Sequence, residues 1–356
     1  MRMLTTLLAG AALAATGVGS PLIIGVVDTI GGTYYDWQNG WSAWRTLCNA
    51  TGHGVYAVWL YSASDQTTFP DRSQRMNFYD YSTRKWAAID TADYMRSGYD
   101  VLPHDRNGIG SIDVDTTEGR PYATTHLGSP IYPALCREVG HGSALFEYSN
   151  APEGYLWPAV AVTANGWMHV AAIDNVSREG LYYIRSREWG AWDPSMHVPD
   201  DQPDPMGPRH NIAASKVSNR VCVTWEYSMG DPDPGFYRES TDGGETWSDP
   251  VELPWPDAYG GDTLTSYHIT SLSPYYDRQD RLHIVTDVMY YIGNSGFIMP
   301  AQIWHWCRDN SPQWHRVRWA GCDPSHLQAG VGYNATYACR ASIGQDRFGN
   351  LHVAWE

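Results

Sequence analysis

Residues 158–173 read PAVAVTANGWMHVAAI and contain the smallest unit from which the fold can be predicted. An apolar stretch leads into the turn Ala164-Asn165-Gly166, and a second apolar stretch begins at Met168. Asn and Gly accept the backbone angles of tight turns, and the flanking residues suit half-buried strands. The stretch therefore predicts two antiparallel strands joined by a short turn.

The same unit recurs along the chain. Its six copies cover residues 45–61, 110–125, 158–173, 210–225, 268–286 and 337–355. Equivalent second-strand positions are Tyr56, Tyr122, His169, Cys222, His283 and His352, separated by 66, 47, 53, 61 and 69 residues. Repetition at this period, with a third strand and a Trp after each pair, predicts an all-β propeller of about six four-stranded blades. A β-sandwich is the main alternative, but it predicts less regular repetition.

Three segments make up the predicted organisation. Arg2, an apolar stretch and small residues up to Ser20 predict a signal peptide over residues 1–20, and hence a secreted or cell-surface protein. Residues 21–43 are a lead-in whose stretch TYYDWQ, residues 33–38, could supply a closing strand. Residues 44–356 form the propeller. Its last unit ends after two strands, so we expect an incomplete final blade and a truncated C-terminus.

Composition excludes some classes of partner. The chain has 24 Lys and Arg against 39 Asp and Glu, a formal charge of -15, and no basic run. Nucleic acids and anionic membranes both require concentrated positive charge, so neither is an expected partner. After the predicted signal peptide, no apolar stretch is long enough to span a membrane. The 17 Trp and 24 Tyr suit half-buried strands and also sugar-facing surfaces.

One motif is more specific than the repeat. Residues 240–247 read STDGGETW and lie between the third and fourth predicted strands of the fourth unit. The positions that define the motif are Ser240, Asp242, Gly244, Thr246 and Trp247. The Asp side chain can accept hydrogen bonds from its own turn, Gly supplies a positive φ, and Trp packs on the blade. This stretch resembles the Asp box, or BNR repeat, of the sialidase-like β-propeller superfamily. In that family the Asp box is a folding device remote from the active site, so it predicts the fold and no reaction.

The resemblance also implies which residues a catalytic site would need. Sialidases of this fold clamp a substrate carboxylate with three arginines and add a Tyr nucleophile, a Glu and an Asp. The usual F/Y-R-I-P motif is absent here, and its nearest analogue is Trp44-Arg45-Thr46. The candidate ligand-binding residues, which we expect to ring one mouth of the central channel, are Arg45, His210, His268 and Arg340. Alternatively, they line a water-filled channel and bind nothing.

No catalytic residue can be chosen, because carboxylates are numerous; Asp113 and Asp115, for example, bracket the end of an inner strand. Acidic loops could in principle hold calcium through Asp200, Asp201, Asp204, Asp231 and Asp233. Their Pro-rich setting is more typical of solvated loops, so neither a cofactor nor a metal is expected.

Three functions remain open. The first is a non-catalytic propeller that binds extracellular ligands, above all glycans, through its channel mouth. The second is a sialidase-like exo-glycosidase that uses Arg45 and Arg340 in a carboxylate clamp. The third is a structural module of a larger surface protein.

Overall fold

The computed structural model is built almost entirely from β-strands. It describes residues 28–35, 38, 42–102, 106–128, 131–205, 207–227, 234–254, 267–292, 295–309, 314–320, 328–329 and 338–355. Within strands, only the backbone is described at residues 267–268, 290–292, 295–300, 318–320 and 328–329. The helix in these ranges is η1 (Tyr94–Arg96), a single 3-10 turn, so the predicted all-β class is confirmed. No helix in this part of the chain is long and apolar enough to cross a membrane. The predicted signal peptide lies outside the described residues.

Five antiparallel sheets follow one another along the chain, and each forms one blade. Blade 1 contains β1 (Leu47–Ala50), β2 (Gly54–Tyr61), β3 (Ser73–Asp80), β4 (Lys85–Trp86) and β5 (Tyr99–Asp100). Blade 2 contains β6 (Asn107–Gly108), β7 (Ile112–Val114), β8 (Pro121–Leu127), β9 (Tyr132–Glu138) and β10 (Phe146–Asn150). Blade 3 contains β11 (Tyr155–Val162), β12 (Met168–Asp174), β13 (Leu181–Glu188), β14 (Ala191–Trp192) and β15 (Met196–His197).

The remaining sheets correct the predicted blade count. Blade 4 contains β16 (His210–Ala214), β17 (Val221–Glu226), β18 (Gly235–Ser240) and β19 (Val251–Glu252). Blade 5 contains β20 (Tyr267–Tyr276), β21 (Leu282–Ile292), β22 (Ser295–Cys307), β23 (His315–Ala320) and β24 (Gln328–Ala329). The sixth unit forms only a two-stranded sheet, β25 (Ser342–Gln345) and β26 (Leu351–Ala354). The structure therefore has five blades instead of about six, because four-stranded pairing stops at blade 5 among the described residues.

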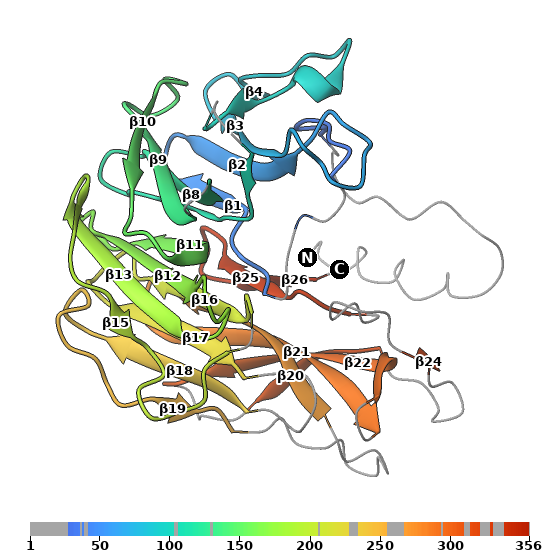
Figure 1. The fold of residues 1–356 in the computed structure, drawn as a ribbon, viewed down its shortest axis with the longest axis vertical. Helices are drawn as coiled ribbons and strands as arrows, with labels where there is room; N and C mark the ends of the chain where they lie inside the picture. The colour runs from blue at the N-terminus through green and yellow to red at the C-terminus, as the bar shows by residue number, and fades with distance from the viewer. Residues whose placement is uncertain are drawn as a thin grey trace, which may run out of the picture.

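The blades are arranged around an axis lined by one inner strand from each blade (Figure 1). Contacts run from β1 to β7, then to β11, β16, β20 and β25 in turn. Apolar side chains fill the space between neighbouring sheets; Ile173 and Trp225, for example, are fully buried in one cluster between blades 3 and 4. Each sheet thus covers its neighbour's apolar face, which is the burial that a propeller provides.

Histidines hold the first turn of three units. Each accepts or donates a hydrogen bond through Nε2 to a side chain six residues earlier, where the first strand ends. The pairs are His169 with Thr163 (3.0 Å), His283 with Asp277 (3.1 Å) and His352 with Asp346 (3.2 Å). The recurrence of His in the second strands therefore has a structural cause.

The opposite ends of the inner strands are irregular. One-residue register shifts interrupt the pairing of β11 between Leu156 and Ala159, and that of β20 between Ile269 and Ser271. Non-glycine residues with positive φ stand at or just before the starts of three inner strands: Ile109 (58°), Trp157 (54°) and Arg340 (53°). Bulges and left-handed residues are costly, and they are concentrated at functional rims of many β-proteins. This end is therefore the better place to look for a binding site.

The lead-in segment packs against blade 1. Tyr34 N–H donates to the carbonyl of Ser62 (2.9 Å), and the Gln38 side chain accepts from Leu60 N–H (2.7 Å). The described part of residues 33–38 forms no strand. Residues 36 and 37 lie outside the described part, so the predicted closing strand stays a prediction.

Candidate functional site: the two ends of the central channel

Among the residues that the structure describes, two cavities lie along the axis, and Arg45 lines both. The first, which we call the turn-side cavity, has a volume of about 360 Å³ and is bordered by the first turns of several units. The second, the strand-start cavity, has a volume of about 380 Å³ and is bordered by the starts of the inner strands. Both volumes are in the range of small-ligand sites.

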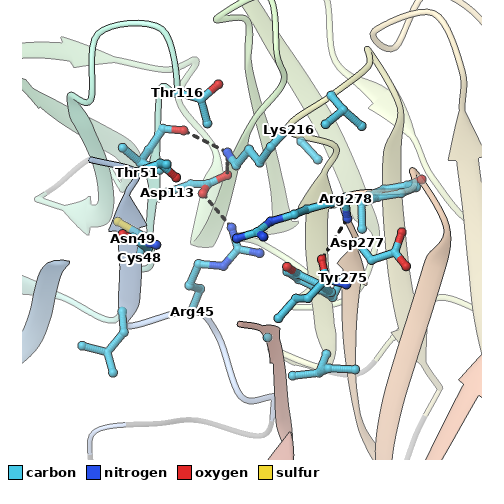
Figure 2. Close-up of a pocket in the computed structure, with 18 of the residues that line it drawn as sticks. Arg45, Cys48, Asn49, Thr51, Asp113, Thr116, Lys216, Tyr275, Asp277 and Arg278 are labelled. Atoms are coloured by element: carbon cyan, nitrogen blue, oxygen red, sulfur yellow. Dashed lines mark hydrogen bonds and ion pairs between the residues drawn. The ribbon is translucent and has the colours of Figure 1, made fainter. Parts of the chain in front are cut away.

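A buried ion network forms one wall of the turn-side cavity (Figure 2). Asp113 on β7 is 1% exposed and contacts Arg45 Nη1 at 2.6 Å and Lys216 Nζ at 2.7 Å. Lys216 also donates to the carbonyls of Val114 (2.9 Å) and Val162 (2.7 Å). The three donor hydrogens of the ammonium are therefore used within the protein. Lys216 belongs to blade 4 and its partners to blades 2 and 3, so it joins three blades.

The electrostatics of this network follow from its composition. Burial alone would raise the pKa of Asp113, but the charges of Arg45 and Lys216 outweigh it and lower the pKa below its ordinary value. Burial also lowers the pKa of Lys216, since Asp113 offsets it only in part and Arg45 repels it. Burial opposes the charge of Arg45 as well, yet Asp113 prevails and raises the pKa of Arg45. Two cations thus share one carboxylate.

The strand-start cavity has different chemistry. Its described lining contains the guanidinium groups of Arg45 and Arg340, the imidazole of His352, and neutral polar side chains from Thr46, Asn211, Ser273 and Ser342. Among the described residues that line it there is no Asp, Glu or Tyr. The cavity can therefore offer hydrogen-bond donors to an anionic group without a competing carboxylate in its lining.

A second buried carboxylate lies beside the Arg340 segment. Asp287 on β21 is 1% exposed and accepts hydrogen bonds from the hydroxyls of Thr270 (2.6 Å) and Ser271. The backbone amide of Ala341, which follows Arg340, also donates to it. Burial raises the pKa of Asp287, because the hydroxyl and amide donors offset it only in part.

The four predicted ligand-binding residues do not all meet at one mouth. Arg45 and Arg340 share the strand-start cavity. His210 is 1% exposed and lines neither cavity; its Nε2 is 3.0 Å from the Trp157 carbonyl, and its ring packs on Trp44. Burial lowers the pKa of His210 to about 4. The side chain of His268 lies outside the described residues, so its predicted role stays a prediction.

The turn at residues 240–247 has the hydrogen bonds expected from its sequence. The Asp242 carboxylate accepts from Glu245 N–H (3.0 Å), Thr246 N–H (2.9 Å), the Thr246 hydroxyl (2.6 Å) and the Ser240 hydroxyl (2.8 Å). Burial opposes ionisation, but these donors outweigh it and lower the pKa of Asp242 to about 2. Gly244 has a φ of 83°, and its N–H donates to Ser240 Oγ (2.7 Å).

This turn lies between β18 and β19, on the outer part of blade 4. Trp247 packs edge-on against Tyr183 of blade 3, with ring centroids 4.7 Å apart. None of its residues lines either channel cavity. The motif therefore supports the junction of two blades and not the channel.

Sequence reasoning missed Lys216, which lies in a turn with no motif around it. In the described part of the acidic loops, Asp204 accepts from Leu181 N–H (3.0 Å) and pairs with His197 (2.8 Å). Among the residues the structure describes, no three His, Cys, Asp or Glu side chains are grouped to hold a metal. Asp231 and Asp233 lie outside them, so that possibility stays untested.

Comparison with known proteins supports the architecture. No family model matches the chain, and no curated protein matches it. Among solved structures, the NanB sialidase from Streptococcus pneumoniae aligns with a TM-score of 0.52 and 10% identity, over 94% of this chain and 68% of that one. The chain shares the propeller fold of this sialidase.

Two further structures fall just below that level of similarity. A protein of unknown function from Dyadobacter fermentans aligns with a TM-score of 0.49 and 12% identity, over 91% of this chain and 96% of that one. A PL25 ulvan lyase aligns with a TM-score of 0.49 and 12% identity, over 82% of this chain and 75% of that one. Identities of this size carry no information about a shared reaction.

Proposed function

We propose that this protein is a secreted or cell-surface β-propeller that binds an anionic glycan in the strand-start cavity. The observation that carries the proposal is that Arg45 and Arg340 both line a cavity whose described lining has no carboxylate. In a protein with a formal charge of -15, such a site places two guanidinium groups beside one cavity, and Arg45 keeps its contact with Asp113 (2.6 Å) on the far side. Arg is the side chain best suited to bidentate contact with a carboxylate or sulfate.

Neutral polar groups complete the site. Asn211, Ser273 and Ser342 can bond sugar hydroxyls, since amides and hydroxyls both donate and accept. One fold neighbour is named a sialidase, so a glycan-directed protein exists on the same architecture. The ligand class is therefore an acidic sugar, such as a sialic acid or a uronic acid.

Binding is favoured over hydrolysis by the same lining. Glycoside hydrolysis in most families needs a pair of carboxylates beside the scissile bond, or a Tyr nucleophile in sialidases. The described lining of the strand-start cavity supplies neither. A sialidase-like exo-glycosidase and a purely structural module are the alternatives that the experiment must separate.

The test is calorimetric titration of the protein with sialyllactose, a glucuronate-containing disaccharide and neutral lactose. We expect at least one anionic sugar to bind and lactose not to bind in the channel. Arg340→Ala should weaken the binding of the anionic sugar by about tenfold to a hundredfold, which corresponds to the loss of one charge-assisted hydrogen bond. Arg96→Ala, at a side chain 77% exposed on η1, is the matched control and should change nothing.

A parallel assay with a fluorogenic sialoside separates the alternatives. Turnover that disappears in Arg45→Ala would establish the hydrolase and overturn the binding proposal. No affinity for any anionic sugar, in a protein that unfolds cooperatively, would favour the structural module.

A further inference from the structure

A third cavity lies on the outer surface, where blade 3 meets the β18–β19 turn of blade 4. Its volume is about 360 Å³. Its apolar lining comes from Tyr183, Pro194, Met196 and Trp247. A Cβ atom at Gly244 would lie 2.0 Å from the Tyr183 hydroxyl, so glycine allows the turn to close tightly against blade 3. The cavity wall is thus fixed by close backbone packing.

Charged side chains in the same cavity balance one another. Arg185 Nη2 contacts Asp193 Oδ2 at 2.6 Å and Glu245 Oε2 at 3.3 Å. Arg187 contacts the same two carboxylates, Asp193 at 3.2 Å and Glu245 at 2.9 Å. Two cations and two anions leave no net charge, in contrast to the strand-start cavity. A charged ligand would therefore gain little electrostatic attraction from this cavity.

The network is held in place from below and still has free hydrogen-bonding capacity. Arg185 Nη1 donates to the Gly243 carbonyl (2.7 Å), and both guanidinium groups lie over the Trp167 ring at 5.4 and 5.2 Å. Asp193 uses Oδ2 for its contacts with both arginines. In the described contacts its Oδ1 has no protein partner, and the side chain is 34% exposed.

We propose that this outer cavity binds a neutral sugar residue, independently of the channel. A pyranose presents adjacent hydroxyls that both donate and accept, which matches planar carboxylate and guanidinium groups held side by side. Its C–H face matches the apolar surface of aromatic rings such as Trp247. Rigid, ion-paired side chains also lose little conformational freedom on binding.

The test is titration of the full chain with neutral methyl pyranosides, followed by tryptophan fluorescence and calorimetry. We expect one or more of them to bind with a Kd of about 10 mM or tighter. Glu245→Gln keeps the side-chain shape but removes an ionic acceptor, and should weaken binding about tenfold or more.

Blade 2 offers a matched control. Glu147 is 41% exposed, pairs with Arg137 at 2.7 Å, and that arginine lies over Trp189 at 4.4 Å, but Glu147 lines none of the three cavities. Glu147→Gln should leave the affinity unchanged. The channel variant Arg340→Ala should also leave it unchanged, which separates this proposal from the channel proposal.

Three outcomes would overturn the inference. The first is no binding of any neutral pyranoside by a folded protein. The second is an equal loss of affinity for the neutral sugar in Glu245→Gln and Glu147→Gln. The third is loss of neutral-sugar binding in Arg340→Ala, which would place that ligand in the channel. Urea unfolding of each variant shows whether it is folded, so that loss of binding is not loss of fold.

Discussion

The two ends of the channel are built from the same inner strands, yet they differ in how their charges are used. At the turn side, Asp113 is shared by Arg45 and Lys216, and the ammonium of Lys216 is bonded to three protein oxygens. At the strand-start side, Arg45 and Arg340 line a cavity with no carboxylate in its described lining. Arg45 takes part at both ends, because its Nη1 pairs with Asp113 while its side chain also lines the strand-start cavity. The turn-side charges hold blades together, whereas the strand-start cavity presents two guanidinium groups and has no carboxylate in its described lining.

The variant with the largest expected effect on stability removes the shared carboxylate of the turn-side network. Asp113→Ala leaves Arg45 and Lys216, whose side chains are 26% and 29% exposed, without the buried carboxylate that they share. Removing one partner from a largely buried ion network is destabilising. We expect a loss of about 3 kcal/mol in the free energy of unfolding, measured by urea denaturation. Asp309→Ala removes an exposed partner of Arg308 and should cost at most about 1 kcal/mol. Equal losses in the two variants would show that the network has no special structural role.

A second test compares the two buried aspartates by pH. The pKa of Asp113 is lowered in the fold, so its stabilisation is present above the unfolded pKa, near 3.8, and is lost as pH falls through the folded pKa. The pKa of Asp287 is raised, so its stabilisation is present below the unfolded pKa and is lost as pH rises through the folded pKa. For each aspartate, the free energy of unfolding can change with pH by at most about 1.4 kcal/mol per pH unit.

The matching variants are Asp113→Asn and Asp287→Asn, unfolded in urea between about pH 3 and pH 7. The stability deficit of Asp113→Asn should shrink towards acid pH, and that of Asp287→Asn should shrink towards neutral pH. Parallel pH profiles for the two variants would contradict the assigned electrostatics.

The variant with the smallest expected effect tests which end of the channel holds the ligand. Arg278 lines the turn-side cavity, is exposed, and donates to the Arg347 carbonyl at 2.9 Å. Arg278→Ala should change stability by less than about 0.5 kcal/mol and leave the affinity for an anionic sugar within about twofold. If it weakened binding as much as Arg340→Ala, the ligand would have to enter from the turn side. Calorimetry under the same conditions decides this.

Much of the fold could be predicted because each hairpin is encoded locally. The turn Ala164-Asn165-Gly166 and its apolar flanks identify β11 and β12 without reference to any other blade. The blade count of about six is not matched, because the sixth unit forms one pair of strands, β25 and β26. Its sequence shows only two strands, but the count of repeats gave this unit the same weight as the units that carry a third and a fourth strand.

The site was less predictable than the fold. Arg45 and Arg340 could be placed at the channel because they precede inner strands. Whether such a residue faces the axis is decided by bulges that sequence periodicity does not show; in β11, the bulge presents the Trp157 carbonyl to His210 and keeps that imidazole buried. Lys216 carries no motif, and only the packing of three blades brings it to Asp113.

The histidine contacts within the first turns have a consequence for how the chain acquires its structure. Each contact joins residues only six positions apart, such as Asp346 and His352, so it can form before any neighbouring blade exists. Closing so short a loop is fast and costs little chain entropy. The emerging polypeptide can therefore carry preformed hairpins that dock in the order of their synthesis, as expected for a repeat architecture assembled from its N-terminal end.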